Sequence, residues 1–200
     1  MDAIKTFPMP TMNAVRIPGA PLMEFTMSSW SFDTSHSEVG FSVSHMVFAR
    51  VRGTFPRWSG TVAADDAGVI TGVSAGIEVE SIDTHEAQRD GHLRSADFFD
   101  AANHPKMTFV STGVRGDTAT SFLLDGTLTI RGTTRPATLD VTFTGGGKDP
   151  WGNTRRGYRA TTRINRRDFG LNWNQALELG GVLVGEVVEI QIETELVKQA

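Results

Sequence analysis

The chain has 200 residues, of which 39% are hydrophobic and 21% are charged, and its formal net charge is -4. This composition is that of an ordinary globular domain that can bury a core of its own. The negative net charge argues against nucleic-acid binding through bulk charge. The absence of cysteine excludes disulfides and cysteine-based zinc or iron–sulfur sites.

The N-terminal segment, residues 1–26, is rich in proline and methionine and shows no hydrophobic periodicity. Because proline fixes φ and removes a backbone donor, the segment is expected to be an extended or disordered arm. An arm that packs along the domain or along a partner is the alternative. The segment lacks the apolar run of a signal peptide, and no stretch of the chain approaches the length of a membrane span. We therefore expect a cytoplasmic protein whose single domain occupies residues 27–200.

Apolar and polar residues alternate with a period of two along most of the chain from Trp30 onward, which predicts strands. The expected strands cover residues 39–45, 51–62, 69–79, 107–109, 122–130, 139–143, 158–164 and 188–196. Glycines recur inside them, as at Gly53, Gly72 and Gly126, and repeated strand glycines suit a strongly coiled, closing sheet. Closure also removes sheet edges. The sequence thus predicts an all-β fold, an antiparallel barrel of about eight strands, with a sandwich as the alternative.

One short helical insertion interrupts the strands. Asp83 and Glu86 have the spacing of a capping box, so the helix is expected over residues 84–94, with its polar residues on a solvated face. Phe98 and Phe99 follow just beyond its end. These rings either seal the helix onto the end of the barrel or border a cavity inside it.

Four stretches carry a resemblance to a known family. They read WSFDTSHSEVGFSVSHM, RVRGTFPRWSGTV, HLRSADFFDAANHPKMTF, and the pair DGTLTIRGTTRPATLDVTF and INRRDFGLNW. In this order and spacing they resemble the YceI-like family of bacterial lipid-binding proteins, from about Trp30 to Leu196. The resemblance implies a lipocalin-like barrel with a long apolar channel, which holds a polyisoprenoid or a similar amphiphile and needs no other cofactor. Many relatives carry a signal peptide, and the lack of one here is a departure.

The inward strand faces supply an apolar lining for such a channel. A buried chain gains roughly 0.8 kcal/mol for each CH₂ group taken out of water, so a long lipid can bind without polar contacts. Periodicity does not distinguish a hollow barrel from a filled one. The predicted ligand-binding residues are Phe41, Val43, His45, Phe98, Phe99, Phe109, Leu124, Leu128, Phe143 and Arg131.

Polar residues near the strand ends are candidates for binding a head group: His36, His45, Arg50, Arg52, Arg131 and Arg135. Arginine forks suit an anionic head, whereas one or two donors suit a neutral head. For Arg131 and Arg135 the alternative is a solvated hairpin tip, and for His45 it is a buried core position. The arginines between residues 155 and 167 predict a solvated basic face, with attraction to anionic lipid as the alternative.

The sequence predicts neither a catalytic residue nor a metal site. The five histidines show no metal-ligand spacing, and no G-x-S-x-G elbow is present. Asp33, Ser35 and His36 are too close in sequence for a triad, so the aspartate is expected to fix a turn. The predicted function is therefore binding and transport or storage of an amphiphilic lipid. Transient membrane contact and a homodimer are left open, as are a small enzyme acting on an isoprenoid and a ligand-free interaction module.

Overall fold

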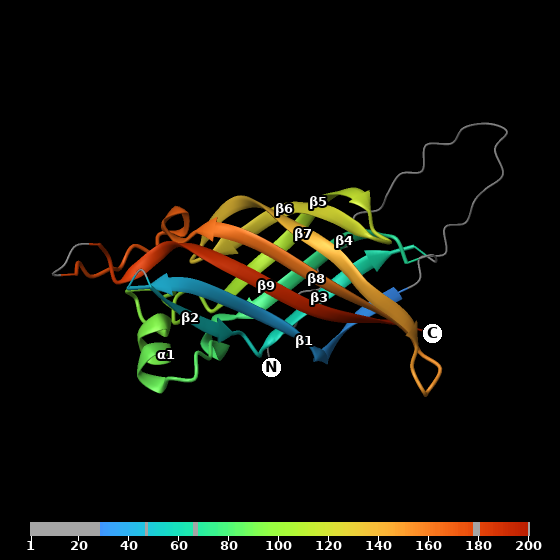
Figure 1. The fold of residues 1–200 in the computed structure, drawn as a ribbon, viewed down its shortest axis with the longest axis horizontal. Coiled ribbons are helices and arrows are strands. Elements are labelled where there is room, and N and C mark those ends of the chain that lie inside the picture. The colour runs from blue at the N-terminus through green and yellow to red at the C-terminus, as the bar shows by residue number, and fades with distance from the viewer. Residues whose placement is uncertain (1–28, 47, 66–67, 178–180, 200) are drawn as a thin grey trace, which may run out of the picture.

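The computed structural model describes residues 29–46, 48–65, 68–177 and 181–199. The predicted N-terminal arm, residues 1–26, lies outside the described residues. The described part forms one antiparallel sheet with one α-helix (Figure 1). The strands are β1 (Ser29–His45), β2 (Ala49–Thr54), β3 (Trp58–Ala64), β4 (Ile70–Glu78), β5 (Lys106–Asp117), β6 (Ser121–Ile130), β7 (Thr133–Lys148), β8 (Thr154–Asn165) and β9 (Val184–Lys198); the helix is α1 (Ala87–Arg94), and Val79–Ser81 and Arg166–Phe169 form 3₁₀ turns. No helix in this part of the chain is long and apolar enough to cross a membrane.

The sheet closes on itself through the long strand β1. One edge of β1 pairs with β9, and the other edge pairs first with β2 and then, near Ser29 and Trp30, with β3. The Phe55 N–H donates to the Val39 carbonyl at 2.9 Å, which extends the β1–β2 ladder beyond β2. Pro56 has no N–H to continue it. Strands β2 and β3 are therefore two parts of one broken strand, and the predicted closed eight-stranded antiparallel barrel is confirmed.

The alternation of side chains decides what faces the barrel interior. Along β6 every second position is buried, from Phe122 through Leu124 and Leu128 to Ile130, while the positions between them are half-buried or exposed. Gly126 occupies the remaining inward position. A Cβ there would lie 2.6 Å from the Val110 carbonyl oxygen and would overlap the Phe109 ring. Glycine is required here because the ring and the neighbouring backbone approach so closely.

The two ends of the barrel differ. The helix end carries α1, the β1–β2 turn and residues 166–177 and 181–183; the far end carries the β3–β4, β5–β6 and β7–β8 turns (Figure 1). At the far end the Arg156 guanidinium lies 5.7 Å from the Trp30 ring centroid and 5.9 Å from that of Phe143. Its Nη1 donates to the Gly68 carbonyl at 2.9 Å. Arg156 thus plugs the far end of the barrel.

Helix α1 begins later than predicted, and the capping box at Asp83 is wrong. The N-cap is Glu86, whose carboxylate accepts hydrogen bonds from the N–H groups of the first turn. Asp83 instead exchanges two backbone hydrogen bonds with Thr54, at 2.8 and 3.0 Å, and His85 has a φ of 61°, which no helix permits. Nor is the polar side of the helix wholly solvated. Asp90 is buried and accepts hydrogen bonds from the N–H (3.0 Å) and hydroxyl of Thr84.

Candidate functional site

An apolar channel with a volume of about 230 Å³ runs inside the barrel. Its lining extends from Phe169 and Leu171 at the helix end to Phe122 and Leu196 toward the far end. The polar side chains among the lining residues are Tyr158, Thr162, Arg166 and Thr194. A channel with so few polar groups suits a hydrocarbon chain.

A second cavity of about 370 Å³ adjoins the channel at the helix end, and we call it the vestibule. It lies between α1 and strands β1 and β2, and several of its lining residues are polar: His45, Glu86, Gln88, Arg89 and His92. Five residues line both spaces: Phe41, Val43, Leu93, Phe98 and Val184. The channel therefore meets the vestibule at this ring of apolar side chains, with polar groups on its outer side.

Phe98 and Phe99 do both of the things that the sequence left open. Phe98 is buried, and its ring centroid lies 5.3 Å from that of Trp173 and 5.1 Å from that of His92. The Phe99 ring packs edge-on against Phe55 at 5.9 Å. Because both rings also line the channel, they fasten the helical segment to the barrel and border the cavity at the same time.

The structure brings most of the predicted ligand-binding residues together. The channel lining includes Phe41, Val43, Phe98, Phe99, Phe109, Leu124 and Leu128. His45 is half-buried in the vestibule wall rather than buried in the core. Contact of these residues with a ligand stays a prediction.

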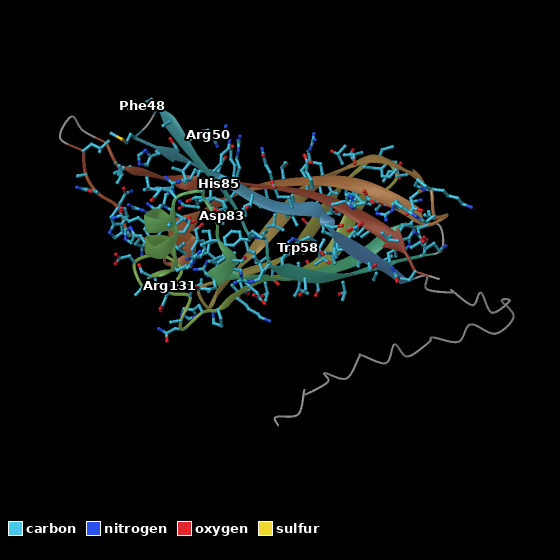
Figure 2. All side chains as sticks on the ribbon, turned by 90° about the horizontal axis from the view of Figure 1, so that it is seen from below. Phe48, Arg50, Trp58, Asp83, His85 and Arg131 are labelled. Carbon is cyan, nitrogen blue, oxygen red and sulfur yellow. The ribbon has the colours of Figure 1, made fainter. Side chains whose placement is uncertain are left out.

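Two predicted residues lie outside both cavities. Phe143 packs against Tyr158, with ring centroids 5.5 Å apart, at the plugged far end. Arg131 belongs to the turn between β6 and β7, near α1 (Figure 2). It donates to the carbonyls of Gly170 at 3.1 Å and Ala96 at 2.9 Å. Its guanidinium therefore ties the loops of the helix end together and does not face the channel.

The other candidates for binding a head group are on the outside. His36, Arg50, Arg52 and Arg135 are exposed, and Arg50 is paired with Glu189. Part of the predicted basic face is a row of ion pairs to β9, because Arg159 pairs with Glu193, Arg163 with Glu189 and Arg167 with Glu186. Attraction of anionic lipid by this row is weakened accordingly.

The cluster at Asp33 is a turn, as expected. A bulge in β1 between Asp33 and Glu38 lets the Asp33 carboxylate accept hydrogen bonds from the Ser35 hydroxyl (2.6 Å) and N–H (3.0 Å). His36 Nδ1 lies 2.9 Å from the same carboxylate. The hydrogen bond from Ser35, followed by those from His36 and Arg155, holds the pKa of Asp33 well below its usual value.

Arg155 lies at the centre of this cluster. It contacts Asp33 and Asp149 at 2.7 Å each, and also Glu195. Burial raises the pKa of Asp149, but hydrogen bonds led by that from Arg155 bring it down to about 2. Among the described residues, Asp33, His36 and Glu195 form the one group with donor atoms close enough for a metal ion. The guanidinium already places a positive charge there.

Two polar residues line the channel that the sequence did not assign to it: Arg166 was expected on the solvated basic face, which is wrong for this residue, and Tyr158 was not singled out. Arg166 is buried at the helix end and donates to the carbonyls of Gly185 (2.9 Å), Val184 (3.3 Å) and Leu171. Burial lowers the pKa of Arg166. Tyr158 is buried further along β8. The available signal was strand parity, since Tyr158 shares the inward face with the other lining residues of β8.

The model of the YceI-like domain family matches residues 30–196. The UPF0312 protein SERP2314 of Staphylococcus epidermidis is 38% identical over 173 residues, covering 84% of this chain and 97% of that protein. The UPF0312 protein of Azotobacter vinelandii is 38% identical over 137 residues, covering 68% and 71%.

Solved structures share the fold. The YCEI protein of Campylobacter jejuni superposes with a TM-score of 0.69 at 28% identity, covering 84% of this chain and 96% of that one. A polyisoprenoid binding domain from Saccharophagus degradans, implicated in plant cell wall breakdown, superposes with a TM-score of 0.60 at 16% identity, covering 86% and 99%. The second likeness is one of fold alone.

Proposed function

The chain belongs to the YceI-like family, and from that premise we propose that its barrel binds one long-chain lipid, a polyisoprenoid or an amphiphile of similar shape, and carries or stores it. The observation that carries the proposal is the apolar channel that meets a polar-edged vestibule at one end. The description of the Saccharophagus degradans domain as polyisoprenoid binding supports this class of ligand.

The size of the channel sets the scale of binding. A volume of 230 Å³ has room for about eight CH₂-sized groups, if each takes the roughly 30 Å³ of a water molecule in the liquid. Taking about eight CH₂ groups out of water contributes roughly 6 kcal/mol before the cost of ordering the chain. A longer lipid has to continue into the vestibule or displace lining side chains.

Binding rather than catalysis is supported by the composition of the channel wall. Of the described residues that line the channel, none is His, Asp or Glu. A general base is therefore missing from the place where the apolar part of a substrate would lie. The vestibule carries ionisable groups of both signs, which suits a neutral or zwitterionic head group with several hydrogen-bonding atoms.

Exposed apolar side chains beside the vestibule support loading from a membrane. In the β1–β2 turn Phe48 is 84% exposed and Met46 is 37% exposed, and Val182 is 40% exposed. The Met46 N–H donates to the Leu183 carbonyl at 2.9 Å, which joins this turn to the segment before β9. Figure 2 shows Phe48 at the outer tip of the helix end. Apolar and aromatic side chains gain free energy when they enter the membrane interface, so this tip is proposed to touch the bilayer while lipid passes.

The chain offers a matched control for the membrane contact. Trp151 is also 81% exposed, but it lies in the β7–β8 turn at the far end. We expect Phe48→Ser to slow the transfer of a fluorescent lipid from vesicles to the protein, and Trp151→Ser to leave the rate unchanged. Equal slowing by both variants, or by neither, would contradict the proposed membrane contact.

The binding proposal itself is tested by mass spectrometry of protein purified from its native host. The protein is measured under native conditions and again after organic extraction. A stoichiometric adduct whose extracted mass contains repeating isoprene units is the expected result. If the protein instead has the mass of the bare chain and also fails to bind a fluorescent lipid probe, the proposal is refuted in favour of a ligand-free module.

A further inference from the structure

Among the described residues that line the channel, one hydroxyl, that of Tyr158, is buried without a hydrogen-bond partner, and we propose that it binds a neutral oxygen acceptor carried by the leading end of the lipid. The inference deepens the proposed lipid-binding function and rests on it. It assigns a polar subsite inside the channel, away from the vestibule, where the apolar end of a simple amphiphile would otherwise lie.

The first observation is the state of the Tyr158 hydroxyl. Tyr158 is only 4% exposed, and within the described part of the chain its hydroxyl oxygen is buried with no hydrogen-bond partner. Its ring packs against Phe122 and Phe143, with centroids 6.2 and 5.5 Å apart. Burying an unpaired hydroxyl is unfavourable, and phenylalanine would make the same ring contacts without that cost. The hydroxyl therefore calls for a partner from outside the chain.

The second observation is where Tyr158 lies. Tyr158 lines the channel, and so does Thr194, its partner across β8 and β9. From Tyr158 to Thr162, which lies in register with Phe41 of the apolar ring through Ile190 of β9, the strand runs four residues, or about 13 Å at roughly 3.3 Å per residue. A ligand that enters from the vestibule meets Tyr158 only with its leading end.

A second unpaired donor supports the polar character of this region. The Trp30 indole Nε1 is also buried without a partner among the described residues. Trp30 and Phe143 both lie against the Arg156 guanidinium, and Phe143 packs on Tyr158. This part of the barrel thus holds two hydrogen-bond donors without a partner among the described residues, whereas the channel wall around it is apolar. A ketone, quinone or ester oxygen fits such a site, because an ionised oxygen would lose its hydration on entering.

The test compares two probes that differ in one oxygen: a long-chain methyl ketone and the alkane with the same number of carbons. The affinity of each is measured by displacement of N-phenyl-1-naphthylamine. In Tyr158→Phe the ratio of ketone affinity to alkane affinity is expected to fall roughly three- to tenfold, as for the loss of one neutral hydrogen bond. Thr161→Val removes a hydroxyl from the exposed outer face of β8 and is expected to leave the ratio unchanged.

A spectroscopic readout separates ligand contact from a structural role. The chain has a single tyrosine, so protein labelled with ¹³C at tyrosine Cζ gives one resonance, which should shift with the ketone and hold its position with the alkane. The ligand-free Tyr158→Phe protein should be at least as stable as the wild type. An unchanged affinity ratio, an unshifted resonance or a destabilised variant would overturn the subsite while leaving lipid binding intact. Failure of both probes to bind the wild type would overturn the lipid-binding function as well.

Discussion

Replacing Ala160 by leucine tests whether the barrel interior is a working channel. Ala160 lies on β8 between Val141 of β7 and Ile192 of β9, and it lines the channel. Leucine adds three carbon atoms, which occupy about 90 Å³ at roughly 30 Å³ each. This is more than a third of the 230 Å³ that the channel offers.

The substitution should have opposite effects on stability and on binding. Filling empty apolar space usually raises the free energy of unfolding by about 0.5–2 kcal/mol. The lipid meanwhile loses room for about three CH₂ groups, or roughly 2.4 kcal/mol, which weakens its binding about fiftyfold. Urea unfolding of the ligand-free protein measures the first effect, and displacement of a fluorescent lipid measures the second.

The neighbouring position provides the control. Thr161 is exposed on the outer face of the same strand, so Thr161→Leu adds apolar atoms without entering the channel and should leave lipid affinity unchanged. If Ala160→Leu instead lowers the free energy of unfolding by about 1–3 kcal/mol, the site is already full. That outcome, or an unchanged lipid affinity in this variant, would refute the hollow-channel argument.

Two further predictions concern the charged groups around the barrel. The pKa of Asp149 is lowered from its usual value of 3.8 to about 2. Its ion pair with Arg155 therefore stabilises the fold fully at a pH above 3.8, and this stabilisation is lost as the pH falls toward about 2. The difference in Tm between wild type and Arg155→Met should therefore shrink over that interval, whereas Arg159→Met, which breaks an exposed pair, should cost little at any pH. Asp90→Ala removes the acceptor of the hydrogen bonds from the buried Thr84 hydroxyl and N–H. We expect this variant to lower the free energy of unfolding, measured by urea titration, by about 1–3 kcal/mol. A loss below about 0.5 kcal/mol would show that these hydrogen bonds do not anchor α1.

The inward-facing residues were predictable because strand parity is a local property. Phe41, Phe109, Leu124 and Leu128 were all assigned to the interior from alternation alone, and each lines the channel. The helix start was not predictable from its local pattern. The capping-box spacing at Asp83 is real, but a backbone bridge to Thr54, far away in the sequence, holds this residue in an extended conformation.

For the residues predicted to bind a head group, contacts with distant parts of the chain again decided the outcome. Arg131 is an arginine in a turn at the correct end of the barrel, yet its donors are taken by carbonyls that belong to two other loops. Arg155 and Arg156 are adjacent in the sequence, but one lies in an outer ion-pair cluster and the other plugs the far end. Residue type does not reveal the partners that approach a side chain from distant strands.

Alternation, glycine placement and turn spacing were enough to predict an antiparallel fold, with a barrel preferred to a sandwich, and most of its inner surface, because each depends on a few consecutive residues. Three features required the folded chain: the joining of β2 and β3 into one broken strand, the space left among the inward side chains, and the unpaired hydroxyl of Tyr158. Each of them depends on the register between strands that are remote in sequence. Register sets which side chains meet across the interior, and so which volume stays empty and which polar atom stays without a partner.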